Sequence, residues 1–92
     1  MNEEQLFNII GKNVKYQRQL YNLNNEKLTQ EQLAEKIGVS TALIGNLESE
    51  KIDQGISIIT LYRLANFFNV PIDDFFKLPQ KYLNNKNTSD KN

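Results

Sequence analysis

Apolar residues recur every three or four positions along most of the chain, and this spacing is typical of amphipathic helices. The first such stretch, residues 2–21, begins with Asn2 and Gln5 at the spacing of a capping box. Its apolar positions share one helical face: Leu6, Phe7, Ile10, Val14 and Tyr21. The pattern predicts a first helix that buries this face in the core.

A second group of side chains in this helix is basic. Lys12, Lys15 and Arg18 follow one another at intervals of three and form a ridge of their own. Such a ridge is explained either by an ordinary solvated face or by a surface that contacts phosphates. The pattern alone leaves both explanations open.

The most informative segment is residues 29–50, TQEQLAEKIGVSTALIGNLESE, which predicts two short helices joined by a tight turn. Thr29 has the position of an N-cap, and Gln32 completes a capping box. Ser40 has the capping position at the start of the second helix. Between the two helices, Gly38 can adopt the left-handed conformation that ends a helix and redirects the chain.

Apolar residues of this segment predict which sides of the two helices are buried. Leu28 and Leu33 have the spacing of a hydrophobic staple around the first cap. Ala34 is small and lies where two crossing helices would approach most closely. Ile44 and Leu47 form the buried stripe of the second helix. The outer face of that helix is therefore left free to read DNA.

Polar connections at 22–28 and 51–56 separate these helices from their neighbours. After the second connection, Ser57 is the expected cap of a helix that continues to about Asn69. The broad apolar face of this helix predicts a core element: Ile58, Leu61, Tyr62, Leu64, Ala65 and Phe68.

A short last helix is predicted over residues 71–78, in which Phe75 and Phe76 are expected to close the core. No segment shows the clean alternation of a β-strand. The predicted architecture is a compact all-α domain of five helices over residues 1–78, followed by a polar, flexible tail over residues 79–92.

Composition narrows the possible functions. The 92 residues are enough for one small domain, and they include no cysteine and no histidine. This excludes disulfides, and also metal sites or catalysis that need a thiolate or an imidazole. Glu48, Glu50 and Asp53 are better explained by a solvated helix end than by a catalytic carboxylate cluster. We therefore expect no enzyme activity, no metal and no cofactor.

Charge and hydropathy bear on location and partners. No segment approaches a membrane span, and the start MNEEQLF lacks the basic end and apolar run of a signal peptide. A cytoplasmic protein with no membrane partner is expected. The net charge of zero counts against a strong nonspecific binder of nucleic acids. It is compatible with a small repressor that uses few phosphate contacts and gains affinity by forming a dimer.

Four segments carry a resemblance to a known family: GKNVKYQR, LTQEQLAEKIGVS, IGNLE and ITLYRLANFFNVPIDDFF. Over about residues 7–78, the chain resembles the phage-repressor/Cro-type, XRE-like helix-turn-helix DNA-binding domain. The resemblance implies a lambda-repressor-like fold in which the second and third helices form the helix-turn-helix. It also implies double-stranded DNA as the partner and transcription regulation as the function.

This resemblance assigns roles to individual residues. Base edges in the major groove would be read by Thr41, Ala42 and Asn46. The DNA backbone would be contacted by Gln30, Gly45 and Lys51. Beside a helix-turn-helix, the basic ridge of the first helix gains a phosphate-facing role, which adds Lys12 and Lys15. Arg18 and Glu48 match a pair that ties the first helix to the third, and we expect a partly buried ion pair there.

Residues 41–46 of the implied recognition helix contain no Arg, Lys or Gln. Arg is the usual bidentate reader of guanine, so Asn46 is left to read adenine. The methyl groups of Thr41 and Ala42 are left to contact thymine. We therefore expect an AT-leaning half-site, with much of the affinity coming from the DNA backbone.

Two functions remain open. One is a repressor that binds DNA as a dimer, with two recognition helices about 34 Å apart in successive major grooves. The other is a protein-interaction module on the same fold, such as an antitoxin, an anti-repressor or a phage-encoded inhibitor. The expected homodimer surface is the last helix and the tail: Ile72, Phe76, Leu78, Tyr82 and Leu83. With no sensor domain in the chain, no small-molecule ligand is expected.

Overall fold

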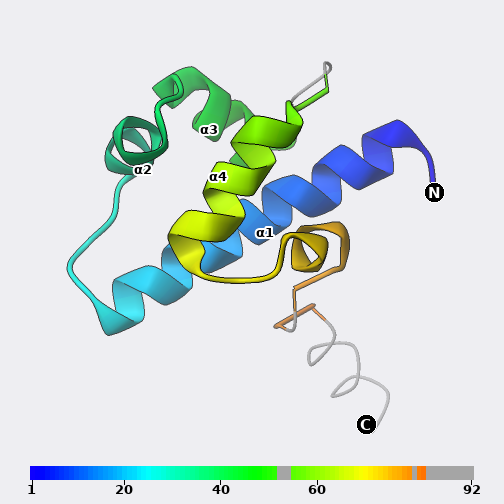
Figure 1. Cartoon of the computed structure of the whole chain (residues 1–92). Coiled ribbons are helices and arrows are strands. Elements are labelled where there is room, and N and C mark those ends of the chain that lie inside the picture. Colours follow the sequence, from blue (N-terminus) through cyan, green and yellow to red (C-terminus); the bar gives the residue numbers. More distant parts are fainter. Residues whose placement is uncertain (52–54, 80, 83–92) are drawn as a thin grey trace, which may run out of the picture.

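In the computed structural model, which describes residues 1–51, 55–79 and 81–82, helices enclose a single apolar core (Figure 1). The described elements are α1 (Glu3–Asn24), α2 (Gln30–Ile37), α3 (Thr41–Glu48), α4 (Ile58–Phe68) and a 3-10 helix, η1 (Ile72–Phe76). This part of the chain contains no strand. The predicted all-α fold, with α2 and α3 as the helix-turn-helix pair, is confirmed.

Side-chain caps start the four α-helices, as the sequence predicts. Asn2 and Thr29 form complete capping boxes at α1 and α2. Ser40 and Ser57 accept a hydrogen bond from the backbone N–H three residues on, at the start of α3 and α4. Gly38 ends α2 in the left-handed conformation, with φ 75°. The tight turn between α2 and α3 therefore depends on a residue that tolerates this conformation without strain.

α1 is longer than predicted, because it continues past Tyr21 to Asn24. Asn24 Nδ2 donates to the carbonyl of Leu20, and Asn25 Nδ2 donates to the carbonyl of Tyr21. The Tyr21 carbonyl is one of the last four of the helix, which lack intrahelical partners, and the Asn25 amide supplies a donor to it. The Tyr21 ring also stacks on Phe67 of α4, with 5.5 Å between ring centroids. Polar asparagines that suggested a connection therefore extend the helix by a turn.

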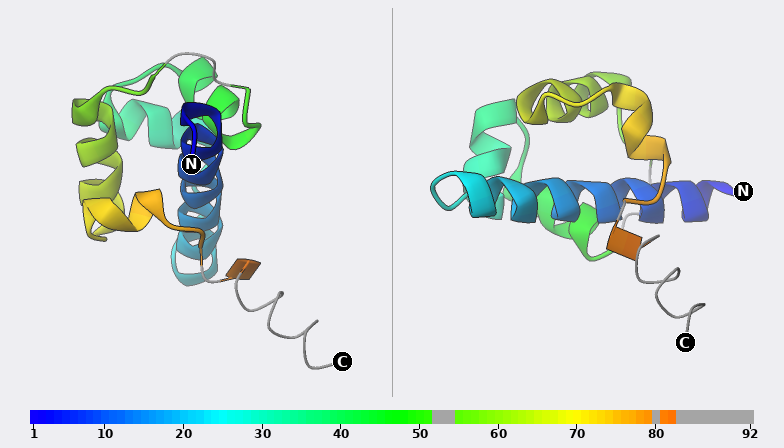
Figure 2. Two further views of the ribbon diagram at one scale, coloured as in Figure 1. Left: turned by 90° about the vertical axis from the view of Figure 1, so that its right-hand side faces the viewer. Right: turned by 90° about the horizontal axis from the view of Figure 1, so that it is seen from below.

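The long α1 runs through the middle of the molecule, with α3 and α4 on opposite sides of it (Figure 2). α3 packs against α1 and α2, while η1 packs against α1 and α4. The buried core takes side chains from every described helix and from the connection before α2: Ile10, Val14, Leu28, Leu33, Ala34, Ile37, Ile44, Leu47, Leu61, Leu64, Ala65 and Phe75. α3 is thus held by α1 and α2.

The predicted core face of α4 was too broad. Leu61, Leu64 and Ala65 are buried, but the side chains of Ile58 and Tyr62 are 69% and 60% exposed. The two exposed residues are four positions apart, so they lie together on one exposed edge of the helix. An apolar pattern cannot distinguish such an edge from the core-facing stripe beside it.

The prediction for residues 71–78 also needs correction. The segment forms a five-residue 3-10 helix, η1 (Ile72–Phe76), and not a helix as long as predicted. Phe75 closes the core as expected, but Phe76 is 38% exposed. Adjacent residues of a short helix point in different directions, so the two rings cannot enter the same core.

Asn13 is a buried polar residue that ties α1 to the C-terminal part of the domain. Its side-chain Nδ2 donates to three carbonyl oxygens, at 2.9 Å to Ile9, 3.2 Å to Phe75 and 2.7 Å to Lys77. The amide is 4% exposed. It therefore holds η1 against α1 through backbone atoms, in addition to the apolar contact of Phe75.

Replacing Asn13 with alanine is expected to lower the free energy of unfolding by about 1–3 kcal/mol, because buried carbonyls lose their donor. Urea denaturation followed by circular dichroism measures the change. Asn24→Ala is the matched control, since it removes an amide whose hydrogen bond is exposed. Equal stability of the two variants would contradict a structural role of the buried amide.

Candidate nucleic-acid interface

α3 presents one buried stripe and one exposed face. Ile44 and Leu47 are fully buried under the helix. Thr41, Ala42 and Asn46, the residues expected to face base edges, are all exposed. The exposed face carries methyl groups, a hydroxyl and one amide, and no charged side chain points from it. This surface offers the hydrogen-bonding and apolar groups that base edges require, without strong attraction to phosphates.

A partly buried ion pair, as expected from the sequence, fixes α3 to α1. Arg18 Nε lies 2.7 Å from Glu48 Oε2, and Arg18 Nη2 lies 2.8 Å from Glu48 Oε1, so the contact is bidentate. Arg18 Nη1 also donates to the carbonyl of Leu28, at 3.0 Å. The hydrogen bonds and the charge of Glu48 raise the pKa of Arg18 above its ordinary value, although burial opposes this. The pair therefore orients the C-terminal end of α3.

Gln30, the first residue of α2, completes this network. Its side-chain Nε2 donates to Glu48 Oε1, at 3.0 Å. Its other side-chain atom, Oε1, lies next to Gly45, where an added Cβ would be 3.5 Å away. The start of α2 is thus braced against the middle and the end of α3. Side-chain contacts thus join Gln30, which is expected to contact phosphate, to the helix that carries the expected base-contacting residues.

The basic residues expected at the DNA backbone have different surroundings. Lys15 and Lys51 are exposed, and Lys51 comes three residues after the end of α3. Lys12 forms an ion pair with Glu50, with Nζ 2.7 Å from Oε1. Glu50 also has a positive φ of 60°. The structure therefore places Lys51 beside α3, and it places Lys12 against a carboxylate that follows α3.

Close contact between α1 and α3 depends on Gly11. A Cβ at this position would lie 1.9 Å from the carbonyl oxygen of Leu47. This role is not evident from the sequence pattern, although a glycine inside a helix is a usable signal because it weakens the helix by about 1 kcal/mol. Such a cost is usually offset by close packing against a neighbouring element. At Gly11 that element is the backbone of α3.

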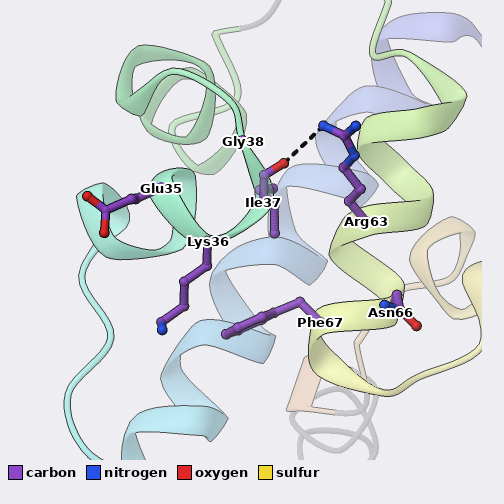
Figure 3. A pocket seen from close by; sticks show the side chains of 7 residues that line it. All are labelled: Glu35, Lys36, Ile37, Gly38, Arg63, Asn66 and Phe67. Carbon is purple, nitrogen blue, oxygen red and sulfur yellow. Dashed lines mark hydrogen bonds between the residues drawn. The ribbon is translucent and has the colours of Figure 1, made fainter.

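Arg63 of α4 forms a hydrogen bond with the end of α2, next to the turn between α2 and α3. Its guanidinium Nη1 donates to the carbonyl of Ile37, the last residue of α2, at 3.2 Å (Figure 3). A pocket of about 430 Å³ lies beside this contact, between α2 and α4. The lining residues are Glu35, Lys36, Ile37, Gly38, Arg63, Asn66 and Phe67. The sequence pattern does not indicate this support, because Arg63 is far from the turn in sequence.

Other kinds of site find no support in the described residues. They contain no group of three or more Cys, His, Asp or Glu side chains placed to hold a metal ion. Within the same residues, none of the helices has the length and the apolar composition needed to cross a membrane.

Two short capped helices, a left-handed glycine between them and an outward second helix define a helix-turn-helix unit. The family model described as helix-turn-helix matches residues 15–75. An uncharacterized HTH-type transcriptional regulator of Methanocaldococcus jannaschii is 41% identical over 63 residues, which are 68% of this chain and 85% of that protein. The chain belongs to the XRE-type helix-turn-helix family of DNA-binding proteins, and the resemblance drawn from the sequence is confirmed.

Proposed function

We propose that this protein is a sequence-specific transcription regulator, a repressor that acts by occupying its operator. The observation that carries the proposal is the outward face of α3, whose Thr41, Ala42 and Asn46 are exposed over a fully buried stripe. The description of the archaeal relative as a transcriptional regulator supports it. Such a function places the protein in the cytoplasm, with double-stranded DNA as its partner.

In this proposal, Asn46 hydrogen-bonds an adenine, and the methyl groups of Thr41 and Ala42 contact thymines. The backbone contacts come from the remaining candidates: Gln30, Lys12, Lys15, Gly45 and Lys51. Because α3 carries no exposed basic side chain, affinity depends on these peripheral contacts. The half-site is therefore AT-leaning.

A homodimer places two such α3 helices on one face of the DNA. The proposed contact surface is the C-terminal part of the domain, where Phe76 and Leu78 are 38% and 41% exposed. Ile72 and Tyr82, two further candidates, are partly buried. Leu83, the remaining candidate, lies outside the described residues. Exposed apolar side chains at this end of the domain support the proposal, because a partner would remove them from water.

Selection of bound sequences from a random duplex pool tests this function and the dimer together. A dimeric regulator enriches two AT-leaning half-sites with centres about 34 Å, or one helical turn, apart. A single half-site would contradict the dimer. No enrichment, and no retained duplex at low salt, would favour a protein-interaction module, to which the uncharged face of α3 is also suited.

Replacing Asn46 with alanine is expected to relax the choice of base at one operator position, with a loss of about 1–3 kcal/mol for the preferred sequence only. Lys51→Ala should weaken binding to operator and unrelated duplex alike, because a phosphate contact carries no sequence information. Fluorescence anisotropy titrations with both duplexes measure the two effects. Asn66→Ala, an exposed amide on α4, is the control and should change neither. Loss of all binding selectivity in Lys51→Ala would contradict these roles.

A further inference from the structure

Glu50 combines three features that structural stability does not explain. It follows the end of α3 with φ 60°, a left-handed conformation that side chains other than glycine disfavour. Its carboxylate reaches α1 and pairs with Lys12, with Nζ 2.7 Å from Oε1. The two side chains are 27% and 35% exposed, so solvent screens the pair. A screened pair contributes little to stability, and the backbone strain offsets what it contributes.

The position of Glu50 relates it to the proposed DNA contacts. Its partner Lys12 and its neighbour Lys51 are both expected to contact phosphate. The ammonium of Lys12 lies 2.7 Å from Glu50 Oε1 and 6.0 Å from the centroid of the Tyr82 ring. Lys12 is thus held by a carboxylate of the protein itself, which a phosphate would have to displace.

We propose that Glu50 is an electrostatic brake on DNA binding, which competes with a DNA phosphate for Lys12 and opposes the phosphate contact of Lys51. The inference rests on the proposed function. Its consequence is a lower affinity for every DNA sequence, because a phosphate contact strengthens binding to every sequence equally. The brake therefore lowers the total affinity for DNA and leaves the ratio between operator and unrelated duplex unchanged.

The test compares Glu50→Gln, which removes the charge but keeps the strained backbone, with Glu50→Gly, which removes both. Asp73→Asn is the matched control. Asp73 also pairs with a lysine, Lys77, at 3.6 Å, but it lies in η1, which contacts α1 and α4 and not α3. Affinity for operator and for unrelated duplex is measured between 0.05 and 0.3 M salt.

Both Glu50 variants are expected to bind either duplex on the order of eightfold more tightly than the wild type at 0.1 M salt. The slope of the logarithm of the binding constant against the logarithm of the salt concentration should be steeper by about 0.9, as one added phosphate contact requires. Asp73→Asn should stay close to the wild type. Adding Lys12→Ala to Glu50→Gln should remove most of the gain, because Lys12 is the released side chain. Glu50→Gly alone should also raise the melting temperature, since glycine accepts the left-handed conformation.

Several results would overturn the brake. If the wild type binds DNA and Glu50→Gln shows the same affinity and salt slope, Glu50 has only a structural role, and the proposed function stands. If Asp73→Asn gains as much DNA affinity as the Glu50 variants, the effect comes from the net charge of the protein and not from the position of Glu50. If the wild type and both Glu50 variants bind no duplex at low salt, the proposed function fails together with the brake. Binding that appears only in the Glu50 variants would support both.

Discussion

Replacing Gly11 with alanine is expected to destabilise the domain severely. The new Cβ would lie 1.9 Å from the carbonyl oxygen of Leu47 and 3.0 Å from its carbonyl carbon. Both are backbone atoms of α3, so no side-chain rotation relieves the clash, and α3 must move away from α1. Because the clash is with backbone atoms, we expect an overpacking cost of about 3–4 kcal/mol, at the top of the usual range or above it, while better helix propensity returns about 1 kcal/mol. We expect a net loss of about 2–3 kcal/mol and a fall in melting temperature of roughly 10–20 °C.

Thermal unfolding followed by circular dichroism measures this effect, and Gly45→Ala is its control. A Cβ at Gly45 would lie 3.5 Å from Gln30 Oε1, which is ordinary contact with a movable side chain. Alanine is also the better helix former, so Gly45→Ala should melt at or above the wild-type temperature. A Gly11→Ala variant that melts within a few degrees of the wild type would show that α1 and α3 do not cross as closely as described.

Local features of the fold were predictable because their physical causes lie within a few residues. A cap satisfies backbone N–H groups of its own first turn, so Thr29 and Ser40 mark helix starts without any tertiary information. Gly38 likewise ends α2 for a local reason. The boundary of α1 was less predictable, since its last turn is stabilised partly by Tyr21 stacking on Phe67 of α4.

Long-range contacts explain what the sequence did not reveal. Asn13 reaches carbonyls of Phe75 and Lys77, more than sixty positions away. Gly11 matters because of Leu47, and Arg63 because of Ile37. None of these pairs has a characteristic spacing, so periodicity and capping rules cannot detect them. Each depends on how the helices cross, and that is fixed only when the whole core is packed.

The outward face of α3 could be anticipated for a simple reason. Ile44 and Leu47 define the buried stripe, and helical geometry then places Thr41, Ala42 and Asn46 on the other side. The surroundings of the basic ridge could not be anticipated in the same way. Glu50 and Lys12 are 38 positions apart, and the left-handed backbone that brings them together is not encoded by a glycine.

Removing the carboxylate of Glu48 is expected to destabilise the protein as strongly as the change at Gly11, for an electrostatic reason. Glu48 is buried and accepts hydrogen bonds from Arg18 and Gln30. In Glu48→Ala, the guanidinium of Arg18 keeps its charge but retains only the carbonyl of Leu28 as a partner. Breaking one side of a fully buried ion pair costs about 3–5 kcal/mol, because the remaining charge is uncompensated. Since the Arg18 side chain is 17% exposed, we expect about 2–3 kcal/mol here. DNA affinity should fall as well, since the end of α3 loses its anchor on α1.

Urea denaturation can separate the cost of leaving one charge unpaired from the contribution of the ion pair to the free energy of unfolding. The variants to compare are Glu48→Ala, Arg18→Ala and a Glu48→Leu/Arg18→Met double variant. Each single variant should lose about 2–3 kcal/mol, while the double variant recovers most of the stability, because no buried charge remains. Glu35→Ala, an exposed glutamate on α2, is the control and should change stability by about 0.5 kcal/mol or less. If both single variants lose less than about 1 kcal/mol, water screens the pair and it does not anchor α3. If the double variant is stable but binds DNA more weakly than the wild type, the role of the ion pair is to position α3.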